Sequence, residues 1–211
     1  MSLTVNVNTA ADFPKLAEGT YLAVCNLLVD LGMQVNEKFN SKSRKVQIGW
    51  ETPEETFEFG DKRVPYTVSK EYTASLNESA TLRQDLSAWR GRDFTPEELA
   101  AFDLRNIVGT SCLINVIHKE SKTKPGKTYV TISSIMALPK GMPKGKLSDK
   151  PVVFDLDVNT LDDVELLPNW LGDKIKKSET YQEKVAAENS VFEPAPGDAL
   201  KPLQDEEELP W

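Results

Sequence analysis

The amino-acid sequence predicts a mainly β protein in which five strands enclose one core and a helical segment separates the third strand from the fourth. The strands are predicted because segments rich in β-branched residues recur along the chain, some of them alternating apolar and polar residues with a period of two. The helical segment is predicted because this period changes to spacings of three and four residues. A third observation concerns the C-terminal end, where prolines and acidic residues accumulate and indicate a partly disordered tail.

The first predicted strand is long and bent. Residues 19–35 are rich in β-branched and apolar side chains, and Gly32 is the candidate for a bulge where the strand must curve. The following residues 36–43 are polar and bear lysines, which predicts a loop.

The second and third strands follow with clear alternation. Residues 44–51 carry apolar side chains on one face only, Trp50 among them, which is typical of a half-buried strand. Residues 66–76 alternate in the same way. Residues 52–65, between them, contain many turn-forming residues and predict an irregular connection.

Two short helices are predicted next. The first has apolar residues at spacings of four and three, namely Leu82, Leu86 and Trp89. Gly91 follows where a left-handed C-terminal residue is common. The second begins with Thr95 as the N-cap, Pro96 at the first helical position and Glu98 completing a capping box.

The last two strands form a predicted hairpin. Residues 108–119 and 127–138 have strand patterns, and the lysine-rich loop 120–126 joins them. Five strands with a helix between the third and the fourth is the order of the OB-fold, a small Greek-key barrel. We therefore expect a five-stranded OB-fold Greek-key barrel with a helical insertion between strands 3 and 4.

Three segments follow from this pattern. Residues 1–150 would form the OB-fold domain with a basic connector, and residues 151–189 a small extension with one edge strand and one short helix. The expected helix has one apolar side, formed by Leu167, Leu171 and Ile175. Residues 190–211 would form the disordered acidic tail.

Charge is distributed unevenly along the chain. The formal net charge of the 211 residues is −8, which argues against a globally basic nucleic-acid binder. Residues 151–211 alone carry −10, whereas residues 1–150 carry +2 and residues 118–150 carry +6. This uneven charge suggests that the first part binds a polyanion and that the acidic tail has a different function.

Several classes of protein are not supported. Two cysteines and one histidine do not suffice for a zinc–thiolate cluster or a disulfide framework, so no metal or cofactor is expected. No apolar run reaches the roughly 20 residues of a membrane span, and the N-terminal residues lack the pattern of a signal peptide. We expect a soluble protein of a reducing compartment.

Catalysis is not expected either. His118 opens onto the basic hairpin and is read as a rim residue, while Cys25 and Cys112 lie among apolar residues and are read as core. Glu54, Glu55 and Glu58 form the only acidic cluster of interest, and a solvated loop explains it better than a metal site. No phosphate-binding loop or nucleophile motif is present.

Binding of single-stranded nucleic acid fits the residues better, because it needs cations that follow the phosphates and aromatic rings on which bases stack. The candidates come from the loops and strands that flank the expected groove: Lys38, Phe39, Lys42, Arg44, Lys45, Lys70, Tyr72, Lys122, Lys124, Lys127 and Tyr129. Trp50 and Trp89 are read as core. For Tyr72 and Tyr129, core packing and stacking stay open, and Phe39 in its polar loop is the best candidate for an exposed ring.

The last seven residues carry the most specific local signal. They are Asp205, Glu206, Glu207, Glu208, Leu209, Pro210 and Trp211, an acidic run that ends on a large ring and a carboxylate. A ring in a solvated tail serves no packing purpose, so we expect it to fill a pocket of a partner protein whose basic rim meets the acids. The same acidic tail can also compete with nucleic acid for the protein's own basic groove.

Two resemblances support this interpretation. The C-terminal tip resembles that of bacterial single-stranded DNA-binding proteins, an acidic run followed by Ile-Pro-Phe, with Leu209 and Trp211 as the departures. Residues 19–141 resemble a family of bacteriophage OB-fold proteins that bind single-stranded DNA, most clearly at residues 72–98, 102–118 and 133–141. This second resemblance implies a phage replication or recombination protein that acts in the host cytoplasm.

The expected function is therefore non-enzymatic. The protein would coat single-stranded DNA without strong sequence preference, recruit replication or recombination proteins through its acidic tip, and have no membrane partner; a homodimer is possible. The alternative is a protein–protein adaptor or virion accessory protein that does not bind DNA. A metal-dependent nuclease that uses the acidic cluster is the least favoured hypothesis.

Overall fold

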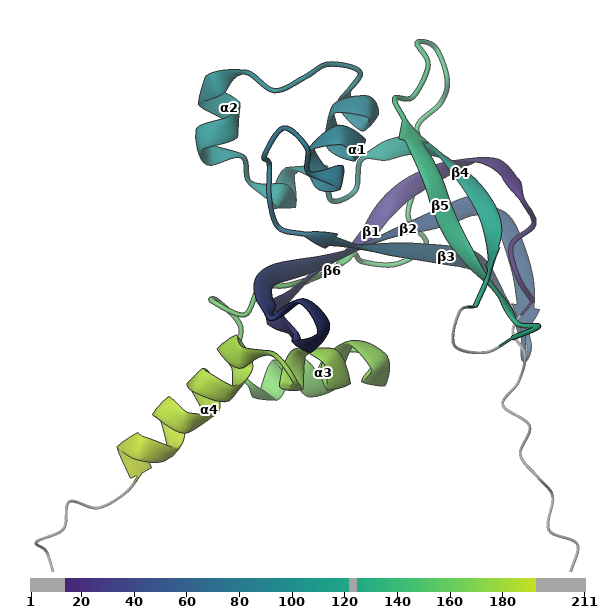
Figure 1. Cartoon of the computed structure of the whole chain (residues 1–211). Helices are drawn as coiled ribbons and strands as arrows, with labels where there is room; N and C mark the ends of the chain where they lie inside the picture. Colours follow the sequence, from purple (N-terminus) through teal and green to yellow (C-terminus); the bar gives the residue numbers. More distant parts are fainter. Residues whose placement is uncertain (1–13, 122–124, 193–211) are drawn as a thin grey trace, which may run out of the picture.

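The computed structural model describes residues 14–121 and 125–192, with side chains up to residue 189. Five antiparallel strands form one curled sheet in the order β3-β2-β1-β4-β5, and a helix, α1, connects β3 to β4 (Figure 1). The mainly β half-barrel with its helical insertion is confirmed, and the arrangement is compatible with an OB-fold. None of the described helices is long and apolar enough to span a membrane.

The elements are these, in chain order: β1 Gly19–Asn36, η1 Glu37–Phe39, β2 Ser41–Phe59, β3 Lys62–Thr73, α1 Thr81–Arg90, α2 Pro96–Ala101, η2 Leu104–Ile107, β4 Ser111–Glu120, β5 Thr128–Met136, β6 Val152–Phe154, η3 Asp162–Leu166, α3 Asn169–Lys176 and α4 Glu179–Phe192. The three η elements are 3-10 helices.

Strand β1 bends twice along its length. Its pairing with β2 shifts register between Cys25 and Leu27 and again between Asp30 and Gly32. Gly32 adopts a φ of +70°, a left-handed conformation that glycine accepts without a steric penalty, so the predicted bulge is confirmed. A Cβ at this position would lie 2.6 Å from Oγ of Ser178, so the bend also lets the C-terminal helices approach closely.

The hairpin of β2 and β3 is longer than the sequence predicts. Residues 52–65, expected to be an irregular connection, continue both strands as far as the pair Phe59 and Lys62, after one register shift between Thr52 and Thr56. The prediction was wrong because the acidic residues obscured β-forming ones: Phe57 packs 4.8 Å from Tyr66, ring centroid to ring centroid. The loop predicted at 36–43 is also shorter, since η1 occupies its first part and β2 begins at Ser41.

The main core lies between the concave side of the sheet and α1. Trp50 and Trp89 are both buried, and their ring centroids lie 5.7 Å apart, which confirms both as core residues. The predicted ends of the helices are also confirmed, because Gly91 caps α1 with a φ of +69° and Thr95 forms a capping box with Glu98 at the start of α2.

Residues 151–192 form a second packing unit, which we call the C-terminal module. Strand β6 pairs in parallel with residues 27–29 of β1. Its apolar cluster contains Val29 and Leu31 of β1 together with Phe154, Leu156, Val164, Leu167, Leu171 and Ile175. The predicted apolar helix side is present, although Leu167 lies just before α3.

The module contains two helices where one was expected. Helix α4 extends to Phe192, so the backbone of residues 190–192 is helical where disorder was predicted. Residues 193–211, which include the rest of the predicted tail, lie outside the described residues.

Candidate nucleic-acid interface

A polar trough crosses the edge of the β2–β3 pair. It consists of two adjoining hollows of about 520 and 540 Å³ that share Lys45 and Glu71. The first hollow extends to the start of α1 and is lined by Lys70, Tyr72, Thr73, Ser75, Asn77, Ser79, Ala80, Thr81 and Leu82. The second extends to η1 and is lined by Gln34, Val35, Asn36, Glu37, Ser41, Ser43 and Lys174.

Two of the predicted cations, Lys45 and Lys70, meet in this trough. Nζ of Lys45 donates to Oγ1 of Thr73 at 2.7 Å, a neutral partner that leaves the charge of the lysine uncompensated. Nζ of Lys70 donates to Oδ2 of Asp85 at 2.7 Å, and its side chain is 22% exposed. Lys45 is therefore the more available cation.

The start of α1 adds hydrogen-bond donors to the same trough. The N-cap residue is Ala80, which has no side chain to accept from the free backbone N–H groups, and the first turn contains no acidic residue. The first N–H groups of a helix lack partners within the helix and carry a partial positive charge. This end of the trough is consequently suited to a phosphate oxygen rather than to a cation.

Of the two possibilities that the sequence leaves open for Tyr72, the structure shows core packing and no exposed ring. The residue is only 3% exposed, and its side chain belongs to the main core beneath α1. Its hydroxyl donates to Oδ2 of Asp85 at 2.8 Å, so Tyr72 and Lys70 hold the same carboxylate. Burial, reinforced by the charge of Asp85, raises the pKa of Tyr72 above its usual value. The residue has a structural role here.

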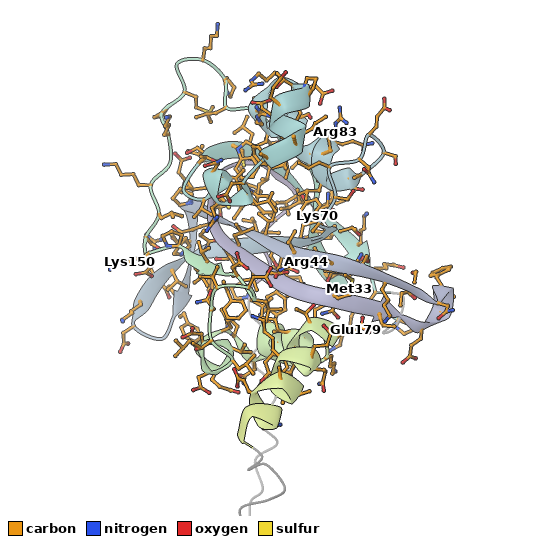
Figure 2. The ribbon with its side chains drawn as sticks, turned by 90° about the vertical axis from the view of Figure 1, so that its left-hand side faces the viewer. Met33, Arg44, Lys70, Arg83, Lys150 and Glu179 are labelled. Atoms are coloured by element: carbon orange, nitrogen blue, oxygen red, sulfur yellow. The ribbon has the colours of Figure 1, made fainter. Side chains whose placement is uncertain are left out.

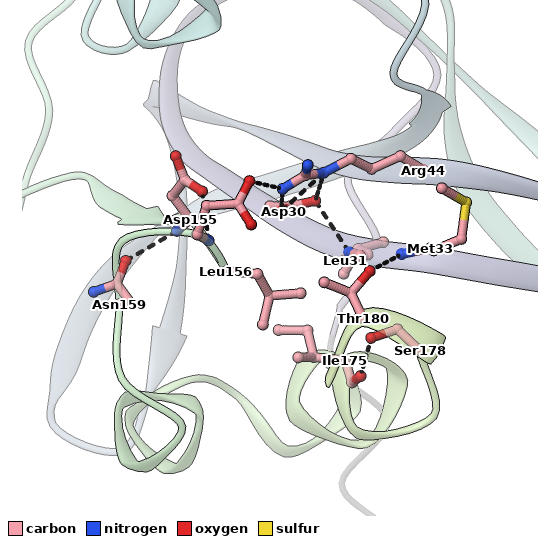
Figure 3. A network of polar contacts seen from close by, with 12 residues as sticks. Asp30, Leu31, Met33, Arg44, Asp155, Leu156, Asn159, Ile175, Ser178 and Thr180 are labelled. Atoms are coloured by element: carbon pink, nitrogen blue, oxygen red, sulfur yellow. Dashed lines mark hydrogen bonds and ion pairs between the residues drawn. The ribbon is translucent and has the colours of Figure 1, made fainter. Parts of the chain in front are cut away.

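Arg44 and Lys42 do not line the trough but pair with carboxylates beside it or in the C-terminal module; Figure 3 shows Arg44 next to Asp30. Arg44 donates from Nη2 to Oδ2 of Asp30 at 2.5 Å and to Oδ2 of Asp157 at 2.7 Å. The hydrogen bond to Asp30 is the main reason why the pKa of Arg44 is raised. Lys42 forms an ion pair with Glu179 at the start of α4. Both cations are thus neutralised by carboxylates.

These ion pairs are part of a wider contact between strands β1 to β3 and the module. The backbone N–H of Met33 donates to Oγ1 of Thr180 at 3.0 Å, and Lys174 pairs with Glu71. Figure 2 shows Lys70, Arg44, Met33 and Glu179 in that order from top to bottom on the face turned to the viewer. The trough therefore adjoins the docked module.

The remaining predicted rings lie at opposite ends of the half-barrel. Phe39, in η1, is 71% exposed, and Nζ of Lys38 lies 5.8 Å from its ring centroid. Tyr129, near the start of β5, is 49% exposed and lies beside the exposed Lys127. In Figure 1 the link between β1 and β2 is close to α3, whereas the tip of the β4–β5 hairpin is at the far end of the sheet. Lys122 and Lys124 lie outside the described residues.

The reactive residues occupy structural positions. Cys25 and Cys112 are fully buried, and burial raises the pKa of both thiols, that of Cys25 to about 12, as expected for core residues. Nε2 of His118 lies 2.8 Å from the carbonyl oxygen of Leu16. Within residues 14–121 and 125–192, no group of three or more His, Cys, Asp or Glu is arranged to hold a metal ion.

Sequence reasoning missed several residues of the trough. Ser75, Asn77, Ser79 and Thr81 precede or begin α1, and the absence of a capping side chain at Ala80 was a readable signal. Lys174 lies more than a hundred residues from Glu71, so no local pattern could have placed it there. The predicted partner-binding tip, residues 205–211, is outside the described part of the chain.

No protein-family model matches the chain, and no curated protein matches it either.

Proposed function

We propose that this protein binds single-stranded DNA without strong sequence preference and that the trough on β2 and β3 receives part of the strand. The observation that carries the proposal is the convergence of Lys45, Lys70 and the uncapped start of α1 on one polar hollow. Phosphate oxygens are stabilised by cations and by helix N-termini together. The half-barrel topology is compatible with an OB-fold, a fold in which oligonucleotides bind across strands 2 and 3.

Two exposed rings outside the trough, at opposite ends of the half-barrel, add sites for bases. Phe39 and Tyr129 are available for stacking, which contributes about 1–3 kcal/mol per base and tolerates any sequence. Binding would thus combine phosphate contacts in the trough with bases on rings at the two ends. The role is one of binding and protection, not catalysis.

The finer parts of the proposal rest on the sequence. The resemblance to bacteriophage OB-fold proteins suggests replication or recombination in the host cytoplasm. The acidic tip with Leu209, Pro210 and Trp211 would recruit partner proteins of those processes.

The test is a titration of labelled oligo-dT, and of a duplex of the same length, by fluorescence anisotropy at several salt concentrations. About five neutralised phosphates predict that log affinity falls with log salt at a slope near −3.5, at about −0.7 per phosphate. Lys45→Gln should make this slope shallower by about 0.7. Lys176→Gln is the control, because Lys176 pairs with Glu165 in the module. Equal affinity for duplex, or binding unaffected by salt, would overturn the proposal.

A second candidate function is that of a protein–protein adaptor. It is favoured by two exposed apolar residues of the module, Leu166 at 83% and Trp170 at 51% exposed. Absence of any binding to oligo-dT in the same titration would support it.

A further inference from the structure

The chain between β5 and β6 carries cations that the proposed trough does not use. Residues 139–150, which we call the lysine ribbon, leave the upper end of β5 in Figure 1 and pass behind the sheet to β6. They have no regular secondary structure and contain Lys140, Lys144, Lys146 and Lys150, with Asp149 as the only acid.

The ribbon is fixed to the barrel at two points. The carboxylate of Glu51, a residue only 4% exposed, accepts from the backbone N–H of Ser148 at 2.8 Å and from its hydroxyl at 2.9 Å. Three residues earlier, the N–H of Gly145 donates to Oγ of Ser111 at 3.1 Å. A buried carboxylate that accepts two hydrogen bonds is a specific anchor, so the ribbon is held against β1 and β2 along this stretch.

Gly145 shows how close this contact is. A Cβ on Gly145 would lie 2.6 Å from Cγ2 of Val24 and 3.2 Å from Cγ of Pro53, closer than side chains normally pack. The backbone of the ribbon therefore touches the sheet at this residue. Lys144 and Lys146, on either side of it, are both exposed.

The four lysines differ from the ion-paired cations of the described residues. Nine arginines and lysines elsewhere are paired with carboxylates, for example Arg44 with Asp30 and Lys174 with Glu71. Within the described residues, no ion pair or hydrogen bond involves the side chain of any of the four. Four uncompensated charges held on an anchored backbone form a fixed cationic strip in a protein whose net charge is −8.

The strip also borders a hollow. Lys144 lines a cavity of about 400 Å³ together with Trp89, Phe102, Ile107 and Leu138. This volume lies within the range of small-ligand pockets, roughly 300–1,000 Å³, and the lining combines aromatic and apolar side chains with polar ones and with two cations, Lys144 and Arg90. Such a lining suits a flat, unpaired base whose phosphate remains near the lysine.

We propose that the lysine ribbon, with the hollow that Lys144 lines, is a second contact site for single-stranded nucleic acid, separate from the trough on β2 and β3. The inference rests on the proposed function, because it extends the path of the same strand over another surface of the barrel. Figure 2 shows Lys150 at the outer edge of the molecule and Arg44 and Lys70 near its middle, so the ribbon adds length to the path.

The test compares the full-length chain with a variant in which four residues are changed, Lys140→Gln, Lys144→Gln, Lys146→Gln and Lys150→Gln. Oligo-dT binding is measured by anisotropy across salt concentrations, with oligomers of increasing length. Each lost lysine–phosphate contact should make the salt slope shallower by about 0.7, up to about 2.8 for all four. The variant should also protect fewer nucleotides than the parent.

A double variant supplies the matched control. Lys144→Gln with Lys146→Gln should weaken binding, while Lys176→Gln with Lys177→Gln, which removes the same charge from the module, should not. An unchanged slope in the fourfold variant, with a shallower one in Lys45→Gln, would overturn the ribbon and leave the proposed function standing. Absence of oligo-dT binding in the parent chain would overturn both.

The acidic tip is the competing occupant. Oligo-dT affinity is therefore also measured for the parent lacking residues 205–211. If this truncated parent and the fourfold variant bind oligo-dT equally tightly, and both bind it more tightly than the full-length parent, the ribbon binds the acidic tip. That result would overturn the nucleic-acid assignment of the ribbon.

Discussion

Arg44 allows a sharp test of the ion pair that joins β2 to β1 beside the C-terminal module. Its guanidinium bonds to both carboxylate oxygens of Asp30, with Nε at 3.2 Å from Oδ1 and Nη2 at 2.5 Å from Oδ2, and also reaches Asp157. The side chain of Asp30 is only 10% exposed, whereas that of Asp157 is 58% exposed. Arg44→Ala would thus leave the almost buried carboxylate of Asp30 without its cation, whereas the carboxylate of Asp157 would remain solvated.

The expected loss of stability follows from this difference in exposure between Asp30 and Asp157. Breaking a fully buried ion pair costs about 3–5 kcal/mol. The side chain of Arg44 is 39% exposed, and the N–H of Gly32 still donates to Asp30 in the variant, so we expect a loss of about 2 kcal/mol in the free energy of unfolding. For a chain of this size that corresponds to a fall of about 4–8 °C in the melting temperature. Asp157→Ala removes only an exposed pair and should cost less than about 1 kcal/mol.

The assay is urea unfolding followed by circular dichroism, with tryptophan fluorescence as a second probe because Trp170 lies on α3. The two variants form the matched pair, since each removes one partner of the same arginine. If Arg44→Ala and Asp157→Ala have equally small effects, Asp30 does not depend on Arg44 and the stabilising role assigned to this ion pair is wrong.

Three further predictions concern stability and the ribbon. Tyr72→Phe should lower the free energy of unfolding by about 1 kcal/mol and leave oligo-dT affinity unchanged, because its hydroxyl bonds to Asp85 inside the core; weaker DNA binding at unchanged stability would contradict the assignment. Gly145→Ala should lower the free energy of unfolding in urea by about 1–3 kcal/mol and weaken oligo-dT binding, because its Cβ would displace the ribbon from Val24. A free energy of unfolding and an oligo-dT affinity equal to those of the parent would refute the close contact. The hydrogen bond from Arg92, with the N–H of Thr95, lowers the pKa of Glu98 from 4.5 to about 2, so its contribution to stability is complete above pH 4.5 and disappears as the pH falls towards 2. Glu98→Gln should flatten the dependence of unfolding free energy on pH in that interval, and an unaltered pH profile would show that the carboxylate is not held in this way.

The fold was predictable where local patterns are strong. Trp50 and Trp89 follow directly from strand and helix periodicity, and Thr95 with Glu98 from capping chemistry. The extension of β2 and β3 was not predicted, because the glutamates and proline of this segment indicated a loop although Phe57 favours a strand.

The candidate site was less predictable, because tertiary partners decide which cations are free. Arg44 and Lys42 look like groove residues in the sequence, yet Arg44 pairs with Asp30 on the neighbouring strand and with Asp157, 113 positions away, and Lys42 pairs with Glu179, 137 positions away. Tyr72 and Lys70 are two residues apart and therefore share one face of β3. Only the position of α1 shows that this face is turned to the core. The lysine ribbon lay in the most basic stretch of the sequence, but its anchoring by Glu51 required the fold.

The central claim, that unpaired DNA binds on the trough, is tested most directly by mapping amide chemical shifts of the full chain during titration with oligo-dT. We expect the largest changes around Lys45, Thr73 and residues 75–82, with a second set at residues 139–150. Changes confined to α3 and α4, or none at saturating oligo-dT, would contradict it.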